Sequence, residues 1–432
     1  MRIWAPLLAL LLWPAAALAF EFFTLEGHGG PIKGIAVSPD GQRILTASFD
    51  NAVGLWSGRS PTWLDGHEAA VNTVAFVDDS RAVSGGDDFA VRLWNLTSGT
   101  SQELGRHKGK VMSVRVSRDQ QIVVSASWDG TVGLWSLSGA DPRFIDVGSN
   151  VNDVAFSTDG ALIYTGASDG KIRIYEVATG NLHQLFLSNG FGVNTLVLNE
   201  DAGWLAYGAV DGVTKVVDVQ TAALIKDVTL ERRPILAMAT DRQQRTLAVG
   251  DGEGYILLLN TSNWSIANDF RATHRGPIWA LAFSQDGENV HAGGLDDAMF
   301  SWPLSDQEHA PRMVKQDRAF LNGNDSASNG ERQFQRKCSI CHTLTGDSAR
   351  RAGPTLKDVF GRRAGAVADY SYSDTLLTSD IVWSAQTIDS LFDLGPDVYI
   401  AGTKMPVQRI ARAEDRADLI EFLRTYSDIK DD

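Results

Sequence analysis

The strongest constraint on the fold is a unit of about 40 residues that recurs along the first three hundred positions. In each copy, an acidic residue stands six positions before a large apolar or aromatic residue, as Asp50 does before Trp56. The seven pairs are Asp50/Trp56, Asp88/Trp94, Asp129/Trp135, Asp169/Tyr175, Asp211/Val217, Glu253/Leu259 and Asp296/Trp302. The pattern is faint in the fifth and sixth units and returns in the seventh. It indicates one supersecondary structure built seven times.

Further signals recur inside the units. His28, His67, His107 and His274 lie 27 or 28 residues before a terminal tryptophan. Alternating segments such as 71–76 and Asp-Gly pairs such as 40–41 are typical of β-strands joined by tight turns. Together these features resemble the WD-repeat family. The resemblance implies an all-β, seven-bladed propeller over residues 20–304.

The same resemblance predicts how the ring is held together. It places the four histidines in hydrogen-bond networks within blades, so we interpret them as structural and not as ligands. The middle units lack this histidine, and we expect packing to hold those blades. Pro303 breaks the chain after the third strand of the seventh unit, and residues 21–25 can supply its missing outermost strand. That pairing would close the ring and remove an exposed sheet edge.

A different signature follows the repeats: Cys338-Ser339-Ile340-Cys341-His342. C-x-x-C-H is the covalent attachment motif of c-type haem, in which two thiols bind the vinyl groups and the histidine supplies an axial nitrogen. These are the only two cysteines of the chain. A zinc site would need a second ligand pair, and a redox dithiol would sit where a strand meets a helix, whereas residues 330–337 look helical. We therefore expect one covalently attached haem c.

Residues 328–432 resemble the class I cytochromes c, which implies an all-α domain. Gly330 and Phe334 match the family's N-terminal helix, and Leu419 and Phe422 match residues that pack the C-terminal helix across it. The resemblance assigns Cys338 and Cys341 to covalent attachment of the haem, and His342 and Met405 to the two axial positions of its iron. The backbone carbonyl of Pro354 would hold the His342 imidazole by its other nitrogen. The residues that would bond the haem propionates are Arg362, Tyr372, Trp383 and Thr403.

Two positions depart from the family pattern. Val407 replaces a surface aromatic residue, which weakens the expectation that partners dock in the family's way. A tyrosine of the helix before the methionine loop is replaced in the 391–392 region, which leaves the tuning of the iron–sulfur bond open. Fewer lysines surround the expected haem edge than is common in the family.

Charge and the N-terminus limit the location and partners. The net charge of −14, most of it before Phe320, argues against nucleic acid or an anionic membrane as partner.

Residues 1–19 have the cation, apolar run and small-x-small site of a secretory signal peptide, with cleavage before Phe20. An uncleaved anchor is the alternative, but the run is short for a span. We expect export to the bacterial periplasm, no membrane span in the mature chain, and a polar linker over 305–327.

Three functions fit these features. With both axial positions filled, the haem would suit one-electron outer-sphere transfer, and the propeller would be a docking platform for redox partner proteins, which its acidity could steer. The second hypothesis is a redox enzyme with a site, and a possible second cofactor, on the propeller. The third is a non-catalytic assembly or scaffold protein. The chain therefore fits an electron carrier better than an enzyme.

Overall fold

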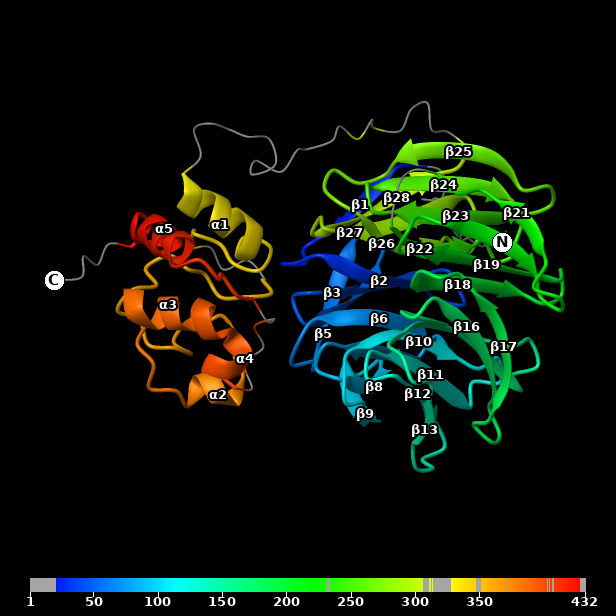
Figure 1. Ribbon diagram of the computed structural model, residues 1–432, viewed down its shortest axis with the longest axis horizontal. Helices are drawn as coiled ribbons and strands as arrows, with labels where there is room; N and C mark the ends of the chain where they lie inside the picture. The colour runs from blue at the N-terminus through cyan, green and yellow to red at the C-terminus, as the bar shows by residue number, and fades with distance from the viewer. Residues whose placement is uncertain are drawn as a thin grey trace, which may run out of the picture.

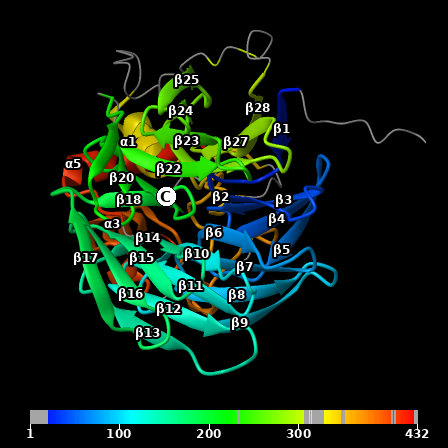
Figure 2. The ribbon, with the colours of Figure 1, turned by 90° about the vertical axis from the view of Figure 1, so that its right-hand side faces the viewer.

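The N-terminal domain is a closed ring of seven four-stranded antiparallel sheets (Figures 1 and 2), as the sequence predicts. The computed structural model describes residues 21–230, 234–305, 311, 313, 328–346, 351–370, 372–401, 403, 405 and 408–427. The predicted signal peptide and nearly all of the predicted linker lie outside these ranges. Among the described residues, no helix has the length and apolar character that crossing a membrane requires.

Each of the first six blades uses four consecutive strands. The first three blades are β2 (Ile32–Val37), β3 (Arg43–Ser48), β4 (Ala52–Ser57), β5 (Ser60–Asp65); β6 (Val71–Phe76), β7 (Arg81–Gly86), β8 (Ala90–Asn95), β9 (Thr100–Arg106); and β10 (Val111–Val116), β11 (Ile122–Ser127), β12 (Thr131–Ser136), β13 (Arg143–Asp146). The next three are β14 (Val151–Phe156), β15 (Leu162–Ala167), β16 (Lys171–Glu176), β17 (Leu182–Ser188); β18 (Val193–Asn199), β19 (Trp204–Ala209), β20 (Thr214–Asp218), β21 (Leu224–Asp227); and β22 (Ile235–Thr240), β23 (Thr246–Asp251), β24 (Tyr255–Asn260), β25 (Ser265–Arg271).

The seventh blade joins the two ends of the ring. It consists of β26 (Ile278–Phe283), β27 (Asn289–Gly294), β28 (Ala298–Pro303) and, as its outermost strand, β1 (Phe23–Glu26). Phe23 pairs with Ser301 and Glu26 with Ala298. Leu25 is 1% exposed, so the closing strand is anchored by burial as well as by backbone hydrogen bonds. The prediction that the N-terminal segment closes the ring is confirmed.

The repeated histidines tie strands together within blades. In the first blade, His28 Nδ1 lies 2.8 Å from an Asp50 carboxylate oxygen, and His28 Nε2 lies 2.7 Å from the Thr46 hydroxyl, which also accepts from Trp56 Nε1 at 2.8 Å. The second and third blades repeat this network around His67 and His107. Their structural role is confirmed.

The seventh blade departs from this network. Its hydroxyl position is occupied by Ala292, and Trp302 Nε1 donates to the Ala272 carbonyl at 3.1 Å. His274 bonds Asp296 through its backbone N–H at 3.0 Å, while its buried Nδ1 has no hydrogen-bond partner in the described part of the chain. The expected network is therefore incomplete here, because the side chain that would join the histidine to the tryptophan lacks a hydroxyl.

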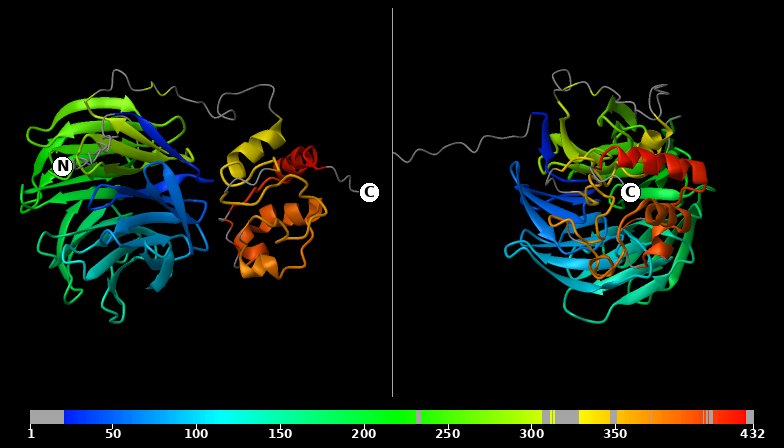
Figure 3. Two further views of the ribbon diagram at one scale, coloured as in Figure 1. Left: turned by 180° about the vertical axis from the view of Figure 1, so that it is seen from behind. Right: turned by 90° about the vertical axis from the view of Figure 1, so that its left-hand side faces the viewer.

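The C-terminal domain is helical, as predicted. Its helices are α1 (Asn329–Lys337), α2 (Asp374–Leu377), α3 (Ala385–Leu394), α4 (Pro396–Tyr399) and α5 (Ala413–Arg424). Helix α5 crosses α1 at Gly330, where a Cβ would overlap the carbonyl oxygen of Asp418. The Phe334 and Phe422 rings lie 5.6 Å apart at this crossing, as the sequence predicts. Figures 1 and 3 show this domain beside one face of the ring.

Candidate functional site

The Cys-x-x-Cys-His segment forms a helical turn directly after α1. Ser328 caps the start of α1 by accepting a hydrogen bond from the Glu331 N–H, and Cys338 is the residue after its last turn. The N–H groups of Cys341 and His342 both donate to the Cys338 carbonyl, at 3.0 and 2.9 Å. The motif therefore follows a helix, as predicted, and not the strand that a thioredoxin-like dithiol would follow.

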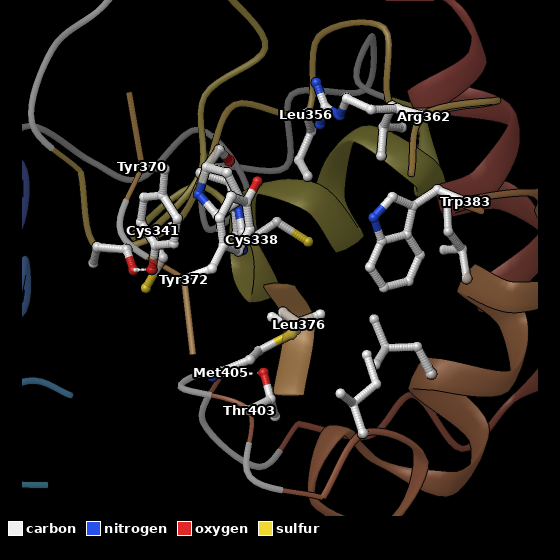
Figure 4. Close-up of a pocket in the computed structure, with 18 of the residues that line it drawn as sticks. Cys338, Cys341, Leu356, Arg362, Tyr370, Tyr372, Leu376, Trp383, Thr403 and Met405 are labelled. Carbon is white, nitrogen blue, oxygen red and sulfur yellow. Dashed lines mark hydrogen bonds between the residues drawn. The ribbon is translucent and has the colours of Figure 1, made fainter. Parts of the chain in front are cut away.

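All nine residues that the sequence analysis assigned to the site line one cavity of the helical domain (Figure 4). The cavity holds roughly 1020 Å³ of empty space including its opening, and most of its wall is apolar. The nine residues are Cys338, Cys341, His342, Pro354, Arg362, Tyr372, Trp383, Thr403 and Met405.

The His342 ring is oriented by a hydrogen bond at its Nδ1 atom. Its Nδ1 lies 2.7 Å from the Pro354 carbonyl oxygen, so Nδ1 carries the proton and Nε2 keeps a lone pair for a metal. Gly353 lies against the His342 ring: a Cβ at position 353 would be 2.5 Å from His342 Cε1. Burial lowers the pKa of His342, opposed by the Pro354 bond and assisted by the Arg362 charge, so the imidazole is neutral at physiological pH.

The two thiols are protected from solvent to different degrees. Cys338 is 3% exposed, whereas Cys341 is half-buried. Burial raises the pKa of Cys338 to about 12 and that of Cys341 to about 11. No group of three or more metal-binding side chains occurs among the residues that the structure describes.

Met405 lies across the cavity from the thiols. Its sulfur points into the cavity in Figure 4, and its backbone N–H donates to the Thr403 hydroxyl at 3.2 Å. Met405 follows α4 in the chain and itself lies in neither a helix nor a strand. The fold therefore brings a thioether 63 residues beyond His342 to the same cavity.

Arg362 is the cation of the cavity wall. Its guanidinium donates to the backbone carbonyls of Lys357 and Thr355. Burial lowers its pKa, with Tyr372 and Asp358 acting in the opposite direction. Both hydrogen-bond acceptors are uncharged, so the guanidinium can also hold an anionic group at the rim. The donor set of two thiols, an imidazole, a thioether and a guanidinium fits a haem with its propionates.

Tyr370 is a cavity residue that the sequence analysis did not select. Its hydroxyl donates to the Ala352 carbonyl at 2.8 Å, and its ring meets that of Tyr372 edge-on at 4.8 Å. Burial raises the pKa of Tyr370. The pair Tyr370 and Tyr372 was visible in the sequence, but only the fold shows that both rings face the cavity. Leu391 and Phe392, at the position where the family has a tyrosine, also line it.

The two other described histidines of the propeller, His183 and His291, belong to no group of metal-binding side chains. His183 lies on an outer strand, 3.8 Å from Glu176. His291 is buried in β27 and lies 3.0 Å from the Ser301 hydroxyl. His309 is outside the described residues. The core interpretation of His291 fits this environment.

Comparison with known proteins agrees with the division into two domains. The family model "Cytochrome c" matches residues 327–427. The "Cytochrome c homolog" of Rickettsia conorii is 36% identical over 155 residues, which cover 35% of this chain and 76% of that protein. The cytochrome c of Guizotia abyssinica is 39% identical over 100 residues, covering 23% of this chain and 87% of that protein.

The propeller has its own relatives. The family model "WD domain, G-beta repeat" matches residues 21–57, 58–95, 99–136, 145–176 and 268–302. The rat protein "Apoptotic protease-activating factor 1" is 32% identical over 164 residues, which are 37% of this chain but only 13% of that protein. The chain thus spans a small fraction of this relative, and the match shows the repeat alone. Through residues 327–427 the chain belongs to the cytochrome c family, and a seven-bladed WD-repeat propeller precedes that domain.

Proposed function

We propose that this chain is a periplasmic electron carrier. One haem c, attached through Cys338 and Cys341 with His342 and Met405 as axial ligands, transfers one electron at a time, and the propeller docks the redox partner protein. A cytochrome c domain implies electron transfer through haem, and a WD-repeat propeller implies protein interaction.

The observation that carries the proposal is the convergence of the nine residues on one cavity. The bound haem supplies the redox centre, and the chain holds and tunes it. Pro354 fixes the orientation of the His342 ring. The Met405 thioether, a soft ligand, favours the ferrous state and so raises the reduction potential. If His342 and Met405 both bind the iron, they would leave no place for a substrate on the metal, which favours electron transfer over catalysis.

The propeller fits the role of a protein platform. The described part of the propeller contains no group of three or more side chains that could hold a metal ion. A tether between platform and carrier raises the local concentration of the carrier at a docked partner. The signal-like leader fits this role, because c-type haem is attached after export. Mass measurement of the exported protein should give a mature chain that begins at Phe20.

The first test is the absorption spectrum of the exported protein in both oxidation states, with the ratio of haem to chain. We expect one low-spin c-type haem per chain and no further cofactor band. Met405→Leu should lower the midpoint potential and let carbon monoxide bind the ferrous iron, because the sixth position opens. Met112→Leu, at the propeller channel, is the matched control and should change neither property. Equal carbon monoxide binding by wild type and Met405→Leu would contradict ligation by Met405.

A further inference from the structure

Two side chains of the haem-binding domain lie at the face of the propeller. Arg351 and Tyr370 come from different loops but meet at Ala352, whose carbonyl accepts from the Tyr370 hydroxyl at 2.8 Å. Ala352 and Tyr370 also line the haem cavity, beside the half-buried Cys341. Arg351 and Tyr370 therefore mark the side of the cavity on which Cys341 lies. The blue propeller strands run past this side in Figure 4.

The first contact is made by the turn between β3 and β4. The Asn51 side chain in this turn is a hydrogen-bonding neighbour of the Tyr370 hydroxyl. Asn51 has a φ of 70°, and its turn joins the end of β3 to the start of β4. The corresponding turns of all blades lie on the same face, because the strand register is repeated around the ring.

The second contact lies one blade away and brings opposite charges to one cavity. Arg351 lines a cavity together with Glu26 at the end of β1 and with Asp296 and Asp297 at the β27–β28 turn. Asp297 and Glu26 are exposed acidic residues, whereas Asp296 is occupied by the backbone of His274 and the guanidinium of Arg275. The buried Nε of Arg351 has no hydrogen-bond partner among the described residues. A cation of one domain thus faces an acidic group of the other.

We propose that this face of the propeller, formed by the Asn51 turn and the Glu26/Asp297 pair, is a docking surface for the haem domain of its own chain, and that docking covers the Cys341 side of the haem cavity. Views from opposite sides agree that the domain lies against this face (Figures 1 and 3). The inference rests on the proposed function and names one partner of the propeller. An external redox partner then reaches this haem edge only when the haem domain leaves the face.

The charge pair gives the docked state a dependence on salt. Arg351 and the exposed Asp297 line the same cavity at the contact, so their opposite charges attract weakly, and the loss of that attraction is measurable as a shift in the docking equilibrium. Screening weakens such a pair as ionic strength rises. The tether offsets part of this loss, because it keeps the domain near its surface.

Docking can be measured by crosslinking in the full-length holoprotein. Both native thiols are expected to be bound to haem, so an introduced pair provides the only reactive thiols. The double variant Asn51→Cys/Asp369→Cys places one thiol on each side of the contact, since Asp369 is exposed and adjoins Tyr370. A short bismaleimide should link the pair within one chain. Gln120→Cys/Asp369→Cys is the matched control, because Gln120 also has a positive φ (59°) but lies in the β10–β11 turn on the opposite face.

A charge exchange tests the second contact in the same assay. In the Asn51→Cys/Asp369→Cys background, Arg351→Glu or Asp297→Lys should slow crosslinking by about two- to fivefold. Combining both substitutions should restore it, because the pair is then reversed. Asp201→Lys makes the same charge change at the β18–β19 turn on the opposite face and should leave the rate unchanged.

The covered edge gives the functional readout. Ferricyanide takes one electron from the ferrous haem at its exposed edge, and the crosslinked chain should react about tenfold more slowly than the same variant before crosslinking. Crosslinking only between two chains, equal rates for the Gln120 control, or unchanged oxidation after crosslinking would overturn the proposal. Failure of the proposed electron-carrier function would appear separately, as an absent or high-spin haem spectrum with crosslinking intact.

Discussion

Single atoms decide whether the cavity can hold an iron ligand in place. Pro354 and Gly353 are neighbours with different tasks: the proline carbonyl orients the His342 ring, and the glycine leaves room for it. A hydrogen bond from behind fixes both the tautomer and the plane of a ligating imidazole. The role of Pro354 was assigned from the sequence by resemblance. The need for a glycine before it became clear only from the distance to the ring.

Gly353→Ala should displace the ring of His342, the proposed iron ligand, from its present position. The added Cβ would lie 2.5 Å from His342 Cε1, so the ring has to tilt away from its Pro354 bond. We expect the tilted ring to bind the iron about 10- to 100-fold more weakly, the scale known for changes behind a metal ligand, and to shift the midpoint potential while the thioether bonds keep the haem attached. Gly346→Ala is the control, since its Cβ meets only the flexible Lys357 side chain at 3.4 Å. A wild-type spectrum and potential for Gly353→Ala would contradict this role.

At the scale of elements, strand and helix contacts depend on a few buried groups. The crossing of α1 and α5 was predictable, because a glycine and large apolar residues at helical spacing mark a close approach. The incomplete hydrogen-bond network of the seventh blade was not predictable from its histidine. His274 is present there as the corresponding histidines are in the first three blades, but its hydroxyl partner is replaced by Ala292. His291, the residue before Ala292, is instead enclosed in β27 with its Nδ1 near Ser301.

The enclosed His291 should make the propeller less stable in mild acid. Burial lowers its pKa from 6.5 to about 4, with Asp286 opposing the shift. A histidine whose folded pKa is depressed stabilises the fold above its unfolded pKa, and this contribution is lost as the pH falls from about 6.5 towards about 4. The difference corresponds to about 3 kcal/mol in the free energy of unfolding. Urea unfolding at pH 7 and pH 4.5 measures it.

His291→Gln tests whether that loss belongs to this side chain. The variant cannot gain a proton, so its free energy of unfolding should fall less between pH 7 and pH 4.5 than that of the wild type. His183→Gln, which changes an exposed histidine of β17, should keep the wild-type pH dependence. A wild-type slope in His291→Gln would assign the acid sensitivity to other groups.

At the scale of the whole molecule, the ring tolerates repeats that have lost their sequence signature. The WD-repeat family model matches five of the blades but not the fifth and sixth, although both are complete four-stranded sheets. Apolar contacts hold these blades, including an edge-on pair of Trp204 and Trp264 at 5.2 Å. Neighbouring blades fix the position of each sheet, so polar networks in some blades are enough.

The ring should depend strongly on its closing strand. Leu25 of β1 is buried between the last and first blades, with Ile32 and Trp56 in the same apolar cluster. Leu25→Ala should lower the free energy of unfolding of the propeller by about 2–5 kcal/mol, because it leaves a cavity at the closure. Leu182→Ala, in the outermost strand of the fourth blade, should change it by less than about 0.5 kcal/mol, since Leu182 is 55% exposed. Calorimetry that gives equal losses would contradict the special role of β1.

The sequence by itself determined the number of blades and the closing strand, and it selected nine residues that line one cavity. These follow from local spacing: a repeat fixes its own period, and the cytochrome motif assigns the residues of the proposed haem site by position. The tertiary structure decided which residues from different parts of the sequence lie in contact. It showed that Tyr370 joins Tyr372 at the cavity, that the seventh blade lacks its network, and that Arg351 faces the acidic residues of the propeller. Such contacts join residues far apart in the chain, and only the packed fold brings them within reach of one another.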